Sequence, residues 1–206
     1  MDSVEQFLVG LAGERLQDVP LLEGLRREML EEGLALYEAL LEDQEDVPEL
    51  RLATARAAHR VGEILVWLGR PVEAEVALQR ADELLHADGD LHGERLLQSI
   101  ALRRQRAVSL RLQERHGEAE ASLVAQLQEL EIGRDGEGHR RALERLRAEA
   151  ALVAVLRDVG RTDELEARVE RMVVELDRVR TERPDDAEVL DLLAAAQLEL
   201  GGLLGT

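Results

Sequence analysis

The chain has 206 residues and a mass of 23.0 kDa, which suits one medium-sized domain or one short repeat array. Its 26 basic and 44 acidic residues give a net charge of −18, which argues against binding to nucleic acid or to an anionic membrane, because both need a basic face. Neither cysteine nor lysine occurs, so the sequence excludes disulfides, cysteine-ligated metals, Schiff-base chemistry and a Walker A lysine.

The sequence carries no targeting or membrane-spanning signal. Its first residues, MDSVEQFLVGLAGE, begin with an acidic residue and contain only a short apolar run, unlike a secretory signal. The longest apolar stretch, residues 150–156, is far shorter than the roughly 20 residues that a spanning helix needs. We therefore expect a soluble, cytoplasmic protein.

Helix is favoured along the whole chain. Leucine, alanine, glutamate and arginine dominate, and apolar residues recur at intervals of three and four. Segments 86–94, 132–139 and 182–188 are rich in glycine, proline and aspartate, which predicts loops. The predicted helices cover residues 3–17, 20–44, 48–68, 71–86, 92–115, 118–131, 139–159, 162–181 and 186–203.

An internal repeat links segments 61–81, 106–126 and 152–172. Four positions correspond between them, at steps of 45 and 46 residues. The corresponding sets are Gly62, Ala107 and Val153; Leu65, Leu110 and Leu156; Ala74, Ala119 and Leu165; and Leu78, Leu123 and Val169. A further start appears at Gly201, 48 residues after Val153. A period of this size predicts a solenoid of stacked helix pairs, since one pair alone cannot bury its apolar face.

The repeat divides residues 1–206 into units within a single all-α domain. The predicted units are roughly 3–47, 48–90, 91–137, 138–183 and a partial unit 184–206. Within one hairpin we expect Gly62 to face Ala74, so that the two backbones approach closely. Gly62→Leu or Ala74→Leu should then overpack the hairpin and cost about 1–3 kcal/mol.

Residues 61–81 resemble the tetratricopeptide repeat. Val61, Gly62, Leu65, Ala74 and Leu78 fall on the spacing of its signature. The resemblance implies a right-handed α-solenoid whose first helices line a concave surface. The period of about 45 residues exceeds the usual 34, which implies lengthened helices or loops.

Residues 7–81 also resemble the repeat region that follows the kinase domain in large bacterial serine/threonine protein kinases. The strings DVPLLEGLRREML and YEALL carry this second resemblance. It implies a regulatory or scaffolding array of a bacterial signalling protein. It does not imply kinase activity, because the chain has no lysine, no HRD and no DFG.

Two clusters of histidines and carboxylates have the residue types of a metal site. They are His86, Asp88, Asp90, His92 and Glu94, and one repeat later Asp135, Glu137 and His139. Their spacing matches neither HExxH nor the twelve-residue calcium loop. We therefore interpret both as solvated loops, and we expect no metal, no cofactor and no enzymatic activity.

The outer faces of the first helices are the candidate binding site. If Gly62 and Leu65 pack inward, the opposite face and its equivalents collect five arginines in a concave groove. The groove residues are Arg56, His59, Glu63, Arg104, Val108, Arg111, Arg147 and Arg157. Arginine pairs bidentately with carboxylates, so such a groove would suit an extended, acidic or carboxylate-terminated peptide. The alternative is that these arginines form salt bridges with the abundant glutamates.

The expected function is protein–protein interaction, as a scaffold or regulatory module. One alternative is a repeat domain that senses a small anion through the arginines. Another is a helical oligomerisation module that uses the exposed end of helix 186–203. The partner and the oligomeric state stay open.

Overall fold

The computed structural model describes residues 23–44, 50–87, 93–132 and 138–204, and this part of the chain is all-helical, with no strand. The helices are α2 (Glu23–Gln44), α3 (Arg51–Trp67), α4 (Pro71–His86), α5 (Glu94–Leu112), α6 (His116–Ile132), α7 (Gly138–Asp158), α8 (Thr162–Glu182) and α9 (Ala187–Leu204). Their bounds confirm the predicted helices to within three residues. The predicted helix 3–17 lies outside the described residues. Among the helices described, none has both the length and the apolar character needed to cross a bilayer.

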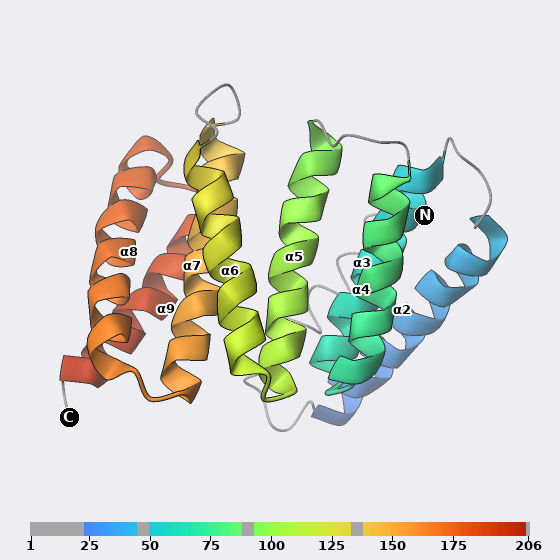
Figure 1. The fold of residues 1–206 in the computed structure, drawn as a ribbon, viewed down its shortest axis with the longest axis horizontal. Coiled ribbons are helices and arrows are strands. Elements are labelled where there is room, and N and C mark those ends of the chain that lie inside the picture. The colour runs from blue at the N-terminus through green and yellow to red at the C-terminus, as the bar shows by residue number, and fades with distance from the viewer. Residues whose placement is uncertain (1–22, 45–49, 88–92, 133–137, 205–206) are drawn as a thin grey trace. The chain divides into compact units, whose positions relative to one another are not determined.

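The chain forms two compact units, residues 1–113 and 114–206. The first contains α2 to α5 and the second contains α6 to α9 (Figure 1). The boundary falls inside the predicted repeat 91–137, between its two helices.

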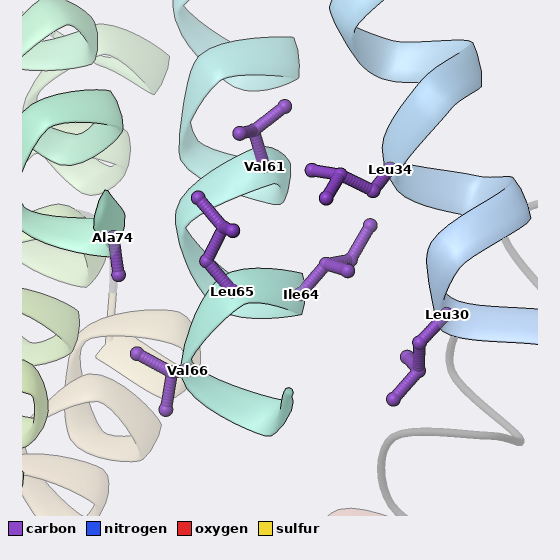
Figure 2. Packing of buried hydrophobic residues seen from close by; sticks show 7 residues of the cluster. All are labelled: Leu30, Leu34, Val61, Ile64, Leu65, Val66 and Ala74. Atoms are coloured by element: carbon purple, nitrogen blue, oxygen red, sulfur yellow. The ribbon is translucent and has the colours of Figure 1, made fainter. Parts of the chain in front are cut away.

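In the first unit, α3 is the central helix and contacts α2, α4 and α5. Figure 2 shows Leu30 and Leu34 of α2 directed toward Val61 and Ile64 of α3. Ala74 of α4 joins the same cluster from the other side of α3. All five side chains are buried, so α3 has apolar neighbours on two faces.

A second cluster in the first unit joins α3, α4 and α5. Its buried members are Ala55, Ala58, Leu78, Ala81, Leu84, Leu85 and Leu102. Gly62 belongs to the same contact, because a Cβ atom placed on it would lie 2.5 Å from both Cγ and Cδ2 of Leu78. The nearest neighbour of Gly62 is therefore Leu78, one helical turn after the Ala74 that the sequence predicted. Glycine at this position lets α3 and α4 approach closely.

In the second unit, α7 contacts α6, α8 and α9, and α8 also contacts α9. Helix α8 runs antiparallel to both α7 and α9 (Figure 1). Their contacts bury an aliphatic core: Leu146, Leu152, Val155 and Leu156 of α7, Leu165, Val169 and Leu176 of α8, and Val189, Leu193 and Ala196 of α9.

Three turns, between α3 and α4, between α5 and α6, and between α7 and α8, each contain one residue with a positive φ angle. Gly69, Glu114 and Gly160 have φ angles of 72°, 61° and 74°, and they follow one another at steps of 45 and 46 residues. At Gly69, the next N–H donates to the carbonyl of Leu65, and the N–H of Gly69 itself donates to Val66. Gly160 is surrounded by the same pair of hydrogen bonds, which define the Schellman motif that ends many helices.

An arginine and a glutamate follow each of these turns. Arg70, Arg115 and Arg161 come directly after the left-handed residue, and each pairs with a glutamate three residues later. These glutamates are Glu73, Glu118 and Glu164. A carboxylate in the first turn of a helix also interacts favourably with the helix dipole.

All twelve corresponding positions of the predicted repeat are buried. The side chains of the first-helix positions are 0 to 8% exposed and those of the second-helix positions are 0 to 2% exposed, and Gly62 is buried as well. Gly201, where the sequence predicted the start of a further unit, is exposed, and a Cβ atom added there would have no neighbour within 4 Å.

Candidate interaction site

Six of the eight predicted groove residues lie on α3 and α5, which contact each other in the first unit. Arg56, His59 and Glu63 are on α3, whereas Arg104, Val108 and Arg111 are on α5. The other two, Arg147 and Arg157, lie on α7 in the second unit, so each group is considered within its own unit.

Arg56 forms an ion pair that joins α3 to α5. One of its terminal nitrogens lies 2.9 Å from Oε1 of Glu94, and both side chains are nearly half exposed, at 47% and 46%. Exposed pairs of this kind contribute about 0–1 kcal/mol, because water screens the attraction. A carboxylate from another molecule could therefore replace Glu94 at little cost.

His59 is buried rather than open to a groove. Its Nδ1 lies 2.6 Å from Nε2 of Gln98 on α5, and its Nε2 is buried without a hydrogen-bond partner. Burial lowers the pKa of His59, while Glu63 opposes the shift and Arg104 and Arg60 add to it. The neutral imidazole is therefore part of the joint between α3 and α5.

The remaining groove residues of the first unit are partly buried. Glu63 lies 2.7 Å from Arg60 and 4.0 Å from Nε2 of His59. Val108 packs against the apolar cluster around Val61, so its side chain belongs to the core rather than to an open surface. Arg104 and Arg111 lie on the same helix and are partly buried.

In the second unit, both predicted arginines pair with α9. Arg147 contacts Glu144 on its own helix and Glu188 on α9. Burial lowers the pKa of Arg147, but these two carboxylates outweigh it and raise the pKa above the usual value. The Nε atom of Arg157 lies 2.8 Å from Oε1 of Glu199. These pairs are the salt bridges that the sequence left as the alternative to a binding groove.

Asp186 connects the start of α7 to the start of α9. Its Oδ2 lies 2.9 Å from Nε2 of His139, and its Oδ1 accepts hydrogen bonds from the N–H groups of Glu188 and Val189. Desolvation raises the pKa of Asp186, but these hydrogen bonds outweigh it and leave the pKa below the usual value. The side chain thus caps α9 and ties it to α7.

The two candidate metal clusters are only partly described. Asp88, Asp90 and His92 of the first cluster, and Asp135 and Glu137 of the second, lie outside the described residues. Within the described ranges, no group of three potential ligands is placed to hold a metal ion. His86 contacts Asp82, Glu94 pairs with Arg56, and His139 pairs with Asp186.

The sequence analysis did not predict the side-chain contacts between α3 and α5 or between α7 and α9. Glu94 and Gln98 of α5 contact α3, and Glu188 and Glu199 of α9 contact α7, across separations of 38 to 42 residues. These separations are slightly shorter than the repeat. Three of the four contacts join an arginine to a glutamate, so opposite charges at that spacing were the available signal, whereas the contact of Gln98 with His59 carried none.

Helix charge alternates along most of the described chain. The even-numbered helices are acidic: α2, α4, α6 and α8 have net charges of −5, −3, −4 and −3. In the same order, they contain 2, 1, 0 and 4 arginines and 7, 4, 4 and 7 carboxylates. The odd-numbered helices α3, α5 and α7 are basic, with net charges of +2, +4 and +2. In the same order, they contain 3, 5 and 5 arginines and 1, 1 and 3 carboxylates. Helix α9 breaks the alternation, since it has three carboxylates and no basic residue.

Ion pairs join neighbouring helices of opposite net charge, although one of them runs from an arginine of the acidic α8 to a glutamate of the basic α7. Arg106 of α5 lies 3.0 Å from Glu75 of α4. In the second unit, Arg145 of α7 contacts Glu175 of α8, and Arg168 of α8 lies 2.9 Å from Glu149 of α7. The excess of acid over base is therefore distributed so that most neighbouring helices attract.

A scan against protein-family models and searches of curated proteins and of solved structures found no match for this chain. The resemblance to tetratricopeptide repeats therefore stays a prediction, and the function has to be argued from the residues.

Proposed function

We propose that the chain is a helical-repeat module of the tetratricopeptide type that binds other proteins. The observation that carries this proposal is the recurrence, at 45 and 46 residues, of one left-handed turn. The turn is followed each time by an arginine–glutamate pair and by a buried residue at the equivalent position of the next helix. A chain built from such units has a right-handed solenoid as its natural architecture, and solenoids present extended binding surfaces.

The face shared by α3 and α5 is the proposed peptide-binding surface. It carries Arg56, Arg104 and Arg111, which give this face a positive character in a chain of net charge −18. Because the pair between Arg56 and Glu94 is exposed, an acidic peptide segment can exchange its carboxylate for that of Glu94. Guanidinium groups favour this exchange, since they bind carboxylates bidentately.

The second resemblance supports a regulatory context. Residues 7–81 are similar to the repeat region of bacterial serine/threonine kinases, which favours a scaffold or regulatory element of a bacterial signalling protein. In that setting the repeat module would select the partner, and another part of the signalling protein would supply the activity.

A peptide-display selection tests the proposal. A library of random peptides is selected against the immobilised chain, and the best binders are resynthesised with each carboxylate replaced by its amide. We expect acidic peptides to be enriched and the amide versions to bind at least tenfold more weakly. Each replaced carboxylate removes an exposed ion pair of about 0–1 kcal/mol, and the losses at several arginines add up to roughly tenfold or more.

The matched variants locate the binding surface. The triple variant Arg56→Glu, Arg104→Glu and Arg111→Glu should lose binding, whereas Arg27→Glu on the exposed face of α2 should retain it. Circular dichroism confirms that both variants are folded. Unchanged binding by the triple variant, or a selection with no preference for acidic peptides, would reject this surface.

A further inference from the structure

Glu94 is a carboxylate that already occupies the face shared by α3 and α5. It is the first residue of α5, and its Oε1 lies 2.9 Å from a terminal nitrogen of Arg56 on α3. Both side chains are nearly half exposed, so the contact is open to solvent. The chain therefore supplies its own example of the chemical group that we propose a partner peptide brings to this face.

The contact between α3 and α5 does not depend on Glu94 alone. About one helical turn further along both helices, Nδ1 of the buried His59 lies 2.6 Å from Nε2 of Gln98. The two contacts span 38 and 39 residues of sequence, so α3 and α5 lie side by side and run in the same direction. Because the buried contact does not involve Glu94, a carboxylate from another molecule can replace that of Glu94 without separating the two helices.

A displaced Glu94 side chain keeps a favourable electrostatic environment. Residue 94 lies in the first turn of α5, where the positive end of the helix dipole stabilises a carboxylate. The N-cap residue of α5 is Gly93, which has no side chain to bond with the N–H groups of that turn. The cost of moving the Glu94 carboxylate away from Arg56 is reduced accordingly.

The corresponding arginine of the second unit is held more firmly. Arg147 follows Arg56 by 91 residues, which is two steps of the repeat. It contacts Glu188 of α9 and also Glu144, whose side chain is only 8% exposed. Drawing a cation away from a largely buried carboxylate is costly. We therefore expect exchange of the carboxylate at Arg56 and not at Arg147.

We propose that Glu94 is a specificity-determining residue, an internal carboxylate that an acidic peptide must displace from Arg56 in order to bind. This inference rests on the proposed binding of acidic peptides to the face of α3 and α5. A peptide carboxylate placed on Arg56 exchanges one exposed ion pair for another, so this arginine adds little net affinity. Most of the affinity must then come from other arginines of the face, and Glu94 determines how acidic a peptide has to be before it binds.

A charge-matched comparison tests this proposal with the full chain. The probe is a fluorescently labelled ten-residue peptide of alternating glutamate and serine, and fluorescence anisotropy gives its Kd for the unmodified chain, Glu94→Gln and Glu32→Gln. Each variant removes one negative charge, and Glu32 is an exposed residue of α2. We expect Glu94→Gln to bind the peptide about two- to fivefold more tightly than Glu32→Gln, which is the range for one exposed ion pair.

A double-mutant cycle asks whether Glu94 acts through Arg56. In a chain that carries Arg56→Gln, adding Glu94→Gln should tighten binding no more than adding Glu32→Gln does. An equal gain from Glu94→Gln with and without Arg56 would assign the effect to overall charge and overturn the proposal. Because the expected result is tighter binding, loss of folding in a variant cannot imitate it.

The outcomes separate this inference from the proposed function. If the unmodified chain binds the peptide, and Glu94→Gln and Glu32→Gln bind it equally, acidic peptides bind without competition from Glu94 and only this inference is overturned. If the unmodified chain and Glu94→Gln both fail to bind, the proposed function and this inference are rejected together. Binding by Glu94→Gln but not by the unmodified chain would support both.

Discussion

Among the described glycines, Gly62 is the one at which an added Cβ atom would make the closest contact. A Cβ atom there would lie 2.5 Å from Cγ of Leu78, which is the branch point of that side chain and has little freedom to move. Gly24 of α2 is the opposite case, because its added Cβ atom would meet nothing within 4 Å. The two glycines therefore make a matched pair.

We expect Gly62→Ala to lower the free energy of unfolding by about 1–3 kcal/mol, because Leu78 or the helix pair must shift. Gly24→Ala should leave stability unchanged or raise it by up to about 1 kcal/mol, since alanine favours helix over glycine. Urea denaturation measures both. In a chain that already carries Leu78→Ala, Gly62→Ala should lower the free energy of unfolding by less than it does in the unmodified chain. An equal decrease would mean that contact with Leu78 is not the cause.

Glu114 occupies a left-handed turn position that is glycine in the two equivalent turns. Its φ angle of 61° costs a residue with a side chain about 1–2 kcal/mol. Glu114→Gly should therefore stabilise the chain by roughly 0.5–1 kcal/mol, after the entropy cost of glycine in the unfolded state. The reciprocal change, Gly160→Glu, should destabilise it by about 1–2 kcal/mol. Thermal unfolding of the two variants should shift in opposite directions, and a shift in the same direction would contradict this interpretation of the turn.

His59 gives the chain an acid-dependent loss of stability. Because burial lowers its pKa in the folded state, the unfolded chain takes up a proton near pH 6.5, where folded His59 is still neutral. The free energy of unfolding should therefore fall as the pH decreases from 6.5 toward the folded pKa. Glu63 reduces this effect, while Arg60 and Arg104 increase it.

The substitution His59→Gln should make the decrease between pH 7.5 and 5.5 smaller than in the unmodified chain. Glutamine does not titrate, and its amide can still bond to Gln98. The control is Gln128→Ala, which changes an exposed side chain of α6 that does not titrate, and it should keep the original pH dependence. Chemical denaturation at several pH values measures the slopes, and identical slopes for the unmodified chain and His59→Gln would exclude His59 as the source.

At the scale of elements, polar contacts join α9 to α7 at three places along their length. His139 pairs with Asp186, Arg147 with Glu188, and Arg157 with Glu199. The surroundings of these pairs differ. Arg147 also pairs with Glu144, a carboxylate on a side chain that is only 8% exposed, whereas the Arg157 side chain is 54% exposed.

Arg147→Ala should therefore cost more than Arg157→Ala. Removing Arg147 takes a cation from a buried carboxylate, which costs on the order of 3 kcal/mol, whereas an exposed pair is worth about 0–1 kcal/mol. Urea denaturation of the two variants should show this difference. Equal decreases in the free energy of unfolding would mean that other groups stabilise the Glu144 carboxylate. In that case, adding Glu144→Ala to Arg147→Ala would not restore stability.

At the scale of the whole molecule, the sequence predicted the helices and their buried faces but not which side chains meet. Helix 71–86 has the bounds that proline and periodicity predicted, and the twelve repeat positions are all buried. Periodicity identifies the inward face of a helix because every third or fourth residue shares it. It does not give the crossing geometry, so Gly62 was expected opposite Ala74 rather than Leu78.

For the candidate site, the sequence placed the residues on helices but did not predict their contacts. The arginines of the first helices do lie on α3, α5 and α7, but His59 is buried and Val108 packs on the core. Glu94 was predicted at the junction of the loop 86–94 and the helix 92–115, where it is the first residue of α5, but its pairing with Arg56 was not predicted. Such pairings depend on how far one helix is shifted along its neighbour, and local sequence does not encode that shift.

The alternation of helix charge also bears on how the chain avoids wrong pairings. If α2 packed against α4, or α6 against α8, two strongly acidic helices would meet and repel, whereas the observed pairs α2 with α3, α4 with α5 and α6 with α7 bring opposite net charges together. The exception is the contact between α8 and α9, which are both acidic. Where the two basic helices α3 and α5 touch, Glu94 of α5 pairs with Arg56 of α3. A newly synthesised chain of this kind can sort its helices by electrostatics before its leucines interdigitate, and its order of assembly should be most error-prone in concentrated salt.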